Sequence, residues 1–180
     1  MRMEFSIWLF RPTVSAGGNG EVTILRGNGN GTFQNTYTYL LPGNAGEILT
    51  GYFDGDQHSD LAVGFYNYSP HVTTFLGDGQ GSFVPGGAVS VGDAHGIAAA
   101  DFDGDGRLDL AVATYFPQSV VVALGDGTGH FGRKHKYVLP ARAPFPIDVA
   151  AGDFNDDGRP DLATANYGTD DSVILLNLPK

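Results

Sequence analysis

The sequence contains an aspartate-rich segment that occurs three times at intervals of about fifty residues, and this repetition limits the fold more than any other feature. The clearest copy reads Asp-Phe-Asp-Gly-Asp-Gly-Arg-Leu-Asp-Leu-Ala-Val and runs from Asp101 to Val112. Weaker copies begin at Tyr52 and Asp153. A unit that recurs at this period predicts a series of similar supersecondary units, each packed against its neighbours.

The copy at Asp101 has the ligand pattern of a calcium loop, because oxygen-bearing residues alternate along a glycine-containing curl. The predicted ligands are Asp101, Asp103, Asp105, the main-chain carbonyl of Arg107, and Asp109. An EF-hand would continue with a glutamate on a helix, whereas here the following residues alternate with the period of a strand. The alternative is an acidic Asp/Gly turn that binds no ion.

The other two copies keep parts of this ligand set. The predicted ligands are Asp153, Asn155, Asp157, the Arg159 carbonyl and Asp161 in the third copy, and Asp54, Asp56, the His58 carbonyl and Asp60 in the first. The first copy is degraded, because Tyr52 provides no carboxylate and Gln57 replaces the turn glycine. We therefore expect two Ca²⁺ sites, stronger at Asp101 than at Asp153. The first copy is either a degenerate third site or a plain hydrogen-bonded turn. Crowding is expected to raise the pKa of carboxylates that no cation neutralises.

A second motif alternates with the first and consists of an apolar run, a glycine-rich turn and an aromatic residue. Together the two motifs predict four short strands per period, which is the pattern of a propeller blade. Small residues before the second and third calcium loops, Ala98–Ala100 and Ala150–Gly152, predict that this strand is the innermost. Phenylalanines recur at two equivalent positions and are expected to pack between blades: Phe33, Phe83 and Phe131 in one set, and Phe53, Phe102 and Phe154 in the other.

The two motifs, in this order and at this spacing, resemble the FG-GAP/VCBS repeat, the blade unit of integrin α-subunit propellers and of many bacterial surface proteins. The resemblance is carried by residues 101–112 followed by Leu-Gly-Asp-Gly-Thr-Gly-His-Phe, and it extends over nearly the whole chain from about Val22. It implies a β-propeller that holds calcium in the hairpin loop between the first and second strands of a blade. It also implies adhesion or ligand recognition through the opposite face.

The predicted fold is all-β: one β-propeller segment over 1–180, with four-stranded antiparallel blades and about 3.5 repeats of roughly 50 residues. Its expected divisions are a partial blade 1–45, a blade 46–94, a blade 95–145 and a partial blade 146–180. Phe5–Phe10 matches a second strand, and the last strand matches a third, so we expect a partial ring. The chain is then part of a larger propeller or a half-ring in a homodimer, with a closed four-bladed monomer as the remaining alternative.

Charge and composition narrow the range of partners. The formal net charge is −10, and the 10 Lys and Arg residues show no basic face in the sequence, so we expect no nucleic acid partner. No apolar run is long enough to span a membrane, and the apolar start of the chain is too short for a clear signal peptide. With 0 cysteines the chain has no disulfide and no thiol nucleophile. The five histidines show no spacing typical of a serine–histidine–acid site, so we expect no enzyme.

Aromatic residues indicate where a ligand would bind. Those expected on the face opposite the calcium loops are Phe65, Tyr66, Tyr68, Tyr115, Phe116, Phe145 and Tyr167. Such side chains stack on sugar rings, receive a peptide, or pack on the neighbouring blade. We therefore expect a non-catalytic calcium-binding module for recognition of a protein or glycan, or for adhesion, at or outside the cell surface. The alternative is a carbohydrate-binding lectin or the propeller part of a polysaccharide-active enzyme.

Overall fold

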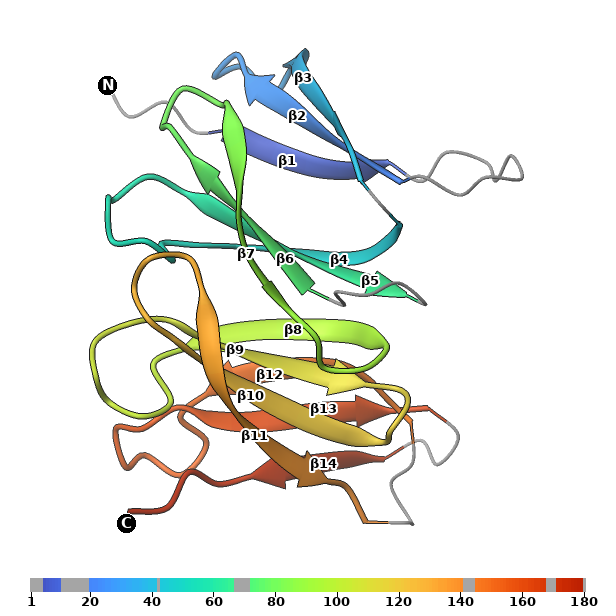
Figure 1. Ribbon diagram of the computed structural model, residues 1–180, viewed down its shortest axis with the longest axis vertical. Helices are drawn as coiled ribbons and strands as arrows, with labels where there is room; N and C mark the ends of the chain where they lie inside the picture. The colour runs from blue at the N-terminus through green and yellow to red at the C-terminus, as the bar shows by residue number, and fades with distance from the viewer. Residues whose placement is uncertain are drawn as a thin grey trace.

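A computed structural model describes residues 5–10, 20–41, 43–66, 72–140, 145–167 and 171–179 (Figure 1). Every regular element in these segments is a β-strand. The strands form four antiparallel sheets, which we number 1 to 4 along the chain. Among the described residues, no helix has the length and apolar character needed to cross a membrane. The all-β prediction is therefore confirmed.

Consecutive strands pair within each sheet. Sheet 1 contains β1 (Phe5–Phe10), β2 (Glu21–Gly27) and β3 (Phe33–Leu40). Sheet 2 contains β4 (Asn44–Gly51), β5 (Asp60–Tyr66), β6 (Val72–Gly77) and β7 (Phe83–Val89). Sheet 3 contains β8 (Ala94–Ala100), β9 (Asp109–Thr114), β10 (Ser119–Gly125) and β11 (Phe131–Val138). Sheet 4 contains β12 (Pro146–Gly152), β13 (Asp161–Asn166) and β14 (Ser172–Leu175).

Sheets 1 and 4 each contain three strands of the four-strand unit. Strands β1, β2 and β3 pair in the same order as β5, β6 and β7, so the segment Phe5–Phe10 is a second strand, as predicted. Strands β12, β13 and β14 pair in the order of β8, β9 and β10. Strands β4 and β8 begin at Asn44 and Ala94, slightly before the blade boundaries expected from the sequence.

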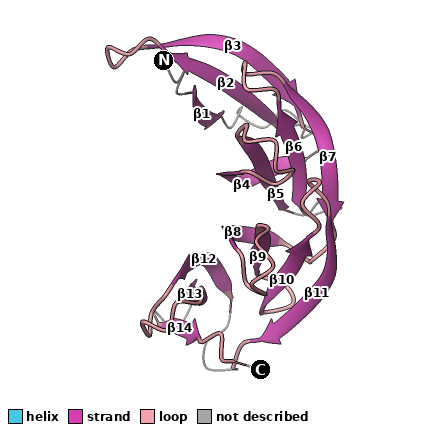
Figure 2. Ribbon diagram, turned by 90° about the vertical axis from the view of Figure 1, so that its left-hand side faces the viewer, coloured by secondary structure: helices cyan, strands magenta, loops and turns pink. Residues whose placement is uncertain are grey.

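Figure 2 shows that the four sheets follow an open arc, with β4, β8 and β12 toward its concave side and β3, β7 and β11 on its convex side. The inner strands contact one another. At Gly96 a Cβ atom would lie only 2.5 Å from the Cα of Asp148, so β8 and β12 approach too closely for a side chain there. The small residues of this strand therefore mark the innermost position, as the sequence predicted. The described residues form propeller-like blades without a closed ring.

Three apolar clusters hold the arc together, one between each pair of neighbouring sheets. Strand β9 is buried along its whole length, because sheet 3 is covered on both faces. The Phe53 and Phe131 rings meet edge to face between sheets 2 and 3, with centroids 5.7 Å apart. The predicted packing of the phenylalanines between blades therefore holds inside the arc, whereas Phe33 and Phe154, on its two end sheets, are 44% and 47% exposed in the single chain.

Glu47 on β4 joins two sheets at the inner edge. The backbone N–H of Ile97 on β8 donates to Glu47 Oε2 at 2.7 Å. Burial raises the pKa of Glu47 above its ordinary value of 4.5; the Ile97 bond lowers it, and the negative charge of Asp148 raises it further. A raised folded pKa means that the charged form opposes folding. The contribution of Glu47 to stability is therefore greatest below pH 4.5 and is lost as pH rises through the folded pKa.

We expect Glu47→Gln, which keeps an acceptor for Ile97 but carries no charge, to remove this pH dependence. The melting temperature of the variant minus that of the unchanged protein should rise between about pH 4 and pH 7. Thermal unfolding followed by circular dichroism across this range measures the difference. The titration of the loop aspartates affects both proteins equally, so its effect on the melting temperature cancels in the difference. Glu47→Ala, which also loses the acceptor, is the control. A difference that stays constant with pH would contradict the assignment.

Candidate metal centres

The three aspartate loops connect the first and second strands of their sheets, β4 to β5, β8 to β9 and β12 to β13, and lie on the same side of the arc (Figure 1). Residues with positive φ make the tight curl in each loop. Gly104 and Gly106 have φ of 80° and 86° in the second loop. Gln57, which replaces the turn glycine of the first loop, adopts φ of 69° and so preserves the curl at some cost in strain.

The second loop gathers three of its predicted ligands. Asp101, Asp103 and Asp109 each offer a carboxylate oxygen, and these atoms lie within 4.8 Å of one another. Calcium binds oxygen at 2.3–2.6 Å, so any two ligands of one ion are at most about 5 Å apart. This donor set therefore fits the hard cation that the sequence predicted. Asp101 is also held in place by backbone N–H groups, with Gly104 N donating to its Oδ1 at 2.7 Å.

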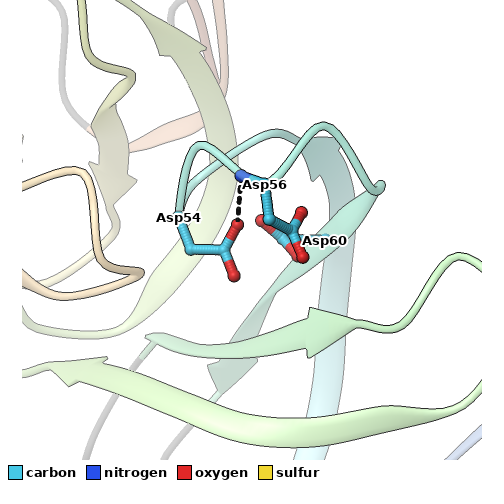
Figure 3. Close-up of side chains that lie close together, drawn as sticks. All are labelled: Asp54, Asp56 and Asp60. Atoms are coloured by element: carbon cyan, nitrogen blue, oxygen red, sulfur yellow. Dashed lines mark hydrogen bonds between the residues drawn. The ribbon is translucent and has the colours of Figure 1, made fainter.

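The first loop gathers its aspartates in the same way, although the sequence ranked it lowest. Oxygens of Asp54, Asp56 and Asp60 also lie within 4.8 Å of one another (Figure 3). The backbone N–H of Asp56 donates to Asp54 Oδ1 at 3.0 Å. Asp56 in turn accepts from the backbone N–H of His58 at 2.7 Å, and its other oxygen lies 3.0 Å from His58 Nδ1. The loss of the first carboxylate at Tyr52 thus leaves a metal-compatible cluster.

Asp105 is not in the second cluster, and the side chain of Arg107 contacts it. Its Oδ2 atom is 3.1 Å from Nη1 of Arg107, and its Oδ1 atom accepts the backbone N–H of Arg107 at 2.9 Å. In the third loop the guanidinium of Arg159 likewise contacts Asp157. Sequence reasoning assigned only the carbonyls of these arginines and missed their side chains. The available signal was an arginine two positions after each of these aspartates.

In the third loop, Asn155 donates from Nδ2 to Asp157 Oδ2 at 2.9 Å. Asp153 accepts the backbone N–H of Gly158 at 2.7 Å. Within the described part of the chain, the carboxylates of this loop do not form a group like those of the first two loops. The ligand roles of Asp153, Asn155, Asp157, Arg159 and Asp161 therefore stay predictions.

The last aspartate of every loop makes a structural contact that sequence reasoning missed. Asp60, Asp109 and Asp161 are at most 1% exposed. Asp109 accepts the N–H of Phe102 at 2.9 Å on one oxygen and that of Gly125 at 2.8 Å on the other. The equivalent donors are Phe53 and Gly77 for Asp60, and Phe154 and Asn177 for Asp161. Each carboxylate thus ties the start of its loop to the end of the third strand, and it keeps lone pairs for an ion.

The carboxyl groups of the loops differ in pKa for two physical reasons. Burial raises the pKa of Asp60 and Asp109, and their backbone hydrogen bonds oppose this shift. The pKa of Asp56 is lowered mainly by the backbone N–H of His58, and that of Asp153 mainly by the N–H of Gly158. In the second loop, where crowding was expected to raise pKa values, the negative charges of Asp103 and Asp101 add to the raised pKa of Asp109.

At the opposite ends of the sheets, aromatic rings form a row that crosses three sheets. The centroid distances are 4.5 Å from Tyr66 to His95, 5.0 Å from His95 to Tyr115 and 4.6 Å from Tyr115 to Phe145. Phe116 contacts the last two rings and is 56% exposed. We call these five residues the aromatic row.

The other aromatic residues named from the sequence are Phe65, Tyr68 and Tyr167. Phe65 is fully buried between sheets 1 and 2, because its alternation along β5 directs it inward. Of the alternatives that the sequence left open, Phe65 therefore follows packing on the neighbouring blade. Tyr68 lies outside the described residues. Tyr167 is exposed, and its backbone N–H donates to the carbonyl of Phe145 at 2.9 Å.

Cationic residues are less scattered than the sequence suggested. Arg133, Lys134 and Lys136 follow one another along β11, an outer strand exposed on both faces. Charged side chains on an outer strand hinder pairing with other chains. The predicted absence of a nucleic acid partner stays a prediction.

Comparison with known families matches this chain twice. The sequence model of the family described as FG-GAP-like repeat matches residues 52–112 and 101–164. Each match starts at or beside an aspartate loop and ends in the strand that follows the next loop. A comparison with curated proteins gives no match.

Proposed function

The chain belongs to the FG-GAP-like repeat family, and on this premise we propose that it is a calcium-binding β-propeller segment that recognises a ligand. The proposal also covers its place, at or outside the cell surface, and its non-catalytic role. The observation that carries it is the pair of aspartate clusters at one end of the strands together with the aromatic row at the other end.

The proposed calcium ions have a structural role. Each cluster takes all its carboxylates from one loop between the first and second strands of a sheet. An ion there would hold the hairpin closed and offset part of the net charge of −10. A site with only three carboxylates has a low ligand charge, which shifts its calcium affinity toward the weak range of extracellular modules and supports a location where calcium is abundant.

The aromatic row is the proposed ligand surface. Its rings belong to sheets 2, 3 and 4, so a ligand that lies along it would contact several repeats at once. Burial lowers the pKa of His95, so this ring is uncharged at neutral pH where it lies between Tyr66 and Tyr115. The exposed ring of Phe116 is the one that suits a sugar ring or an apolar or aromatic side chain of a peptide.

A non-catalytic role is supported by the contacts of two histidines. His58 lies against the Asp56 carboxylate in a loop, and His95 is stacked between Tyr66 and Tyr115. Neither arrangement resembles a histidine that activates a serine nucleophile. The enzyme alternative, a propeller acting on polysaccharide, would instead require hydrolysis of a bound glycan, which reducing-sugar release measures.

We expect Phe116→Ser to weaken ligand binding roughly tenfold, because an exposed ring that stacks on a ligand contributes about 1 kcal/mol or more. A glycan array and a displayed peptide library, each read with calcium and with chelator, identify the ligand class. Val84→Ser on β7, which is 61% exposed and pairs with Leu76 at the aspartate-loop end of sheet 2, is the matched control. If both variants bind equally well, the aromatic row is not the ligand surface.

A further inference from the structure

Neighbouring sheets in the arc always meet through the same two faces. We call the face directed toward the next sheet in the chain the forward face, and the face directed toward the preceding sheet the rear face. The cluster between sheets 3 and 4 takes Ala111, Val120 and Val122 from the forward face of sheet 3. On the rear face of sheet 4 it takes Val149 and Leu162. The same pairing of faces recurs at all three junctions.

The forward face of sheet 4 is also largely apolar, but no other sheet of the described residues lies against it. The register aligns Ile174 on β14 with Val122 on β10, since Asn177 and Gly125 both donate to the last aspartate of their loops. Val122 is 5% exposed, whereas Ile174 is 56% exposed. Likewise Ala113 is fully buried, and its counterpart Ala165 is exposed.

The phenylalanine after the start of each loop shows the same trend. Phe53 is 2% exposed and packs on sheet 3, and Phe102 is half-buried against the cluster between sheets 3 and 4. Phe154, at the same position in sheet 4, is 47% exposed. Leu176, two positions beyond Ile174, is 48% exposed. The forward face of sheet 4 is therefore an apolar surface of the kind that the other sheets bury.

The rear face of sheet 1 carries the complementary residue. Phe131 of sheet 3 receives Phe53 edge to face, and Phe83 of sheet 2 receives Tyr39 edge to face at 6.2 Å. Phe33 holds the same place in sheet 1 and is 44% exposed. A backbone hydrogen bond accompanies the ring contact between sheets 2 and 3, in which Gly129 N–H donates to the Phe53 carbonyl at 2.9 Å. Gly31 is the counterpart of Gly129 in sheet 1.

We propose that the forward face of sheet 4 docks on the rear face of sheet 1 of a second copy of this chain. Phe154 of one copy would then pack on Phe33 of the other as Phe53 packs on Phe131. Two copies related by a two-fold axis make this contact twice and close a ring of about eight sheets, within the range of known propellers. The inference rests on the blade arrangement, and it is independent of calcium binding and of the aromatic row.

We assign a second copy as the partner of the forward face of sheet 4, because the internal junctions show which kind of surface a forward face binds. Each junction joins a forward face to a rear face of the same repeat, and within the described segments the rear face that no cluster covers is the one on sheet 1. Figure 2 shows sheets 1 and 4 at opposite ends of the arc, so one chain in this conformation cannot join them.

Size-exclusion chromatography with light scattering tests the closure. We expect a mass twice the 19.0 kDa of one chain. The double variant Phe154→Asp with Ile174→Asp should restore the single-chain mass, because charges would lie in the contact. Val84→Asp on β7, which is 61% exposed and outside both faces, is the matched control and should stay at the doubled mass. A single-chain mass for the unchanged protein overturns the proposal.

Cross-linking identifies the surfaces, and the absence of native cysteines makes it specific. Phe33→Cys and Phe154→Cys are made in separate chains, mixed, and treated with a short bis-maleimide. We expect a covalent dimer in the mixture and none from either variant alone. Both substitutions in one chain should also give intermolecular products. An internally bridged single chain would instead show that the protein closes on itself as a four-sheet ring, and no product in the mixture would show that the two faces do not meet; either outcome overturns the proposal.

Discussion

Asp109→Ala is expected to lower the free energy of unfolding by about 2–6 kcal/mol, because each buried donor left without an acceptor costs about 1–3 kcal/mol. The two donors are the backbone N–H groups of Phe102 and Gly125, bound at 2.9 and 2.8 Å. Burial raises the pKa of Asp109, so losing the buried charge offsets part of this cost and favours the lower half of the range. The measurement is urea unfolding in excess chelator, which separates this contribution from metal binding.

Two variants serve as controls for this prediction. Asp109→Asn retains one carbonyl oxygen as an acceptor and should lose roughly half as much stability. Asp103→Ala, at an exposed position of the same loop, should change stability by less than about 0.5 kcal/mol in chelator. If Asp109→Ala unfolds at the same urea concentration as the unchanged protein, the carboxylate does not hold loop and strand together.

Calcium should raise the melting temperature of the protein, and chelation should lower it. An ion that binds only the folded loop stabilises by about 2.7 kcal/mol per site at a hundred times its dissociation constant. The two clusters of carboxylate oxygens, each within 4.8 Å, are the expected sites. Differential scanning calorimetry in calcium, in magnesium and in chelator measures the effect. An unchanged melting curve in all three solutions would refute a structural role for calcium.

Substitutions within single loops assign the sites. Asp103→Asn and Asp56→Asn should each remove one site and a comparable part of the calcium-dependent shift, because both residues lie in the compact clusters. Asp157→Asn should have the smallest effect, since its carboxylate already contacts Arg159 and Asn155. The sequence alone ranks Asp157 above Asp56. The opposite order in calorimetry therefore distinguishes a ranking by geometry from one by ligand type.

Features that depend on local pattern were predictable from the sequence. The period of the aspartate loops led to the four-strand unit, and small residues identified the inner strands β8 and β12. The assignment of Phe5–Phe10 as a second strand followed from the order of the motifs. Each of these inferences uses residues that are neighbours in the chain, where turn chemistry and strand period act directly.

The contacts of the loop carboxylates were not predictable in the same way. Asp60, Asp109 and Asp161 look like ordinary ligands in the sequence, yet each binds the backbone at the end of the third strand. Asp105 and Asp157 look equivalent to the other ligands in the sequence, but each forms an ion pair with the arginine two positions later. Which carboxylates converge depends on side-chain conformation, which residue type and spacing leave open.

Residue types and their spacing specify the repeating four-strand unit: its strands, its loops, the inner and outer strands of each sheet and its repeat family. Which copies of that unit are buried by a neighbouring sheet is seen only in the packed structure. Phe53 and Phe154 occupy the same position in the repeat, yet one is 2% exposed and the other 47%. The physical reason is that burial depends on whether another sheet lies against the face, and an alternating strand pattern marks the two faces of a sheet without stating what covers either.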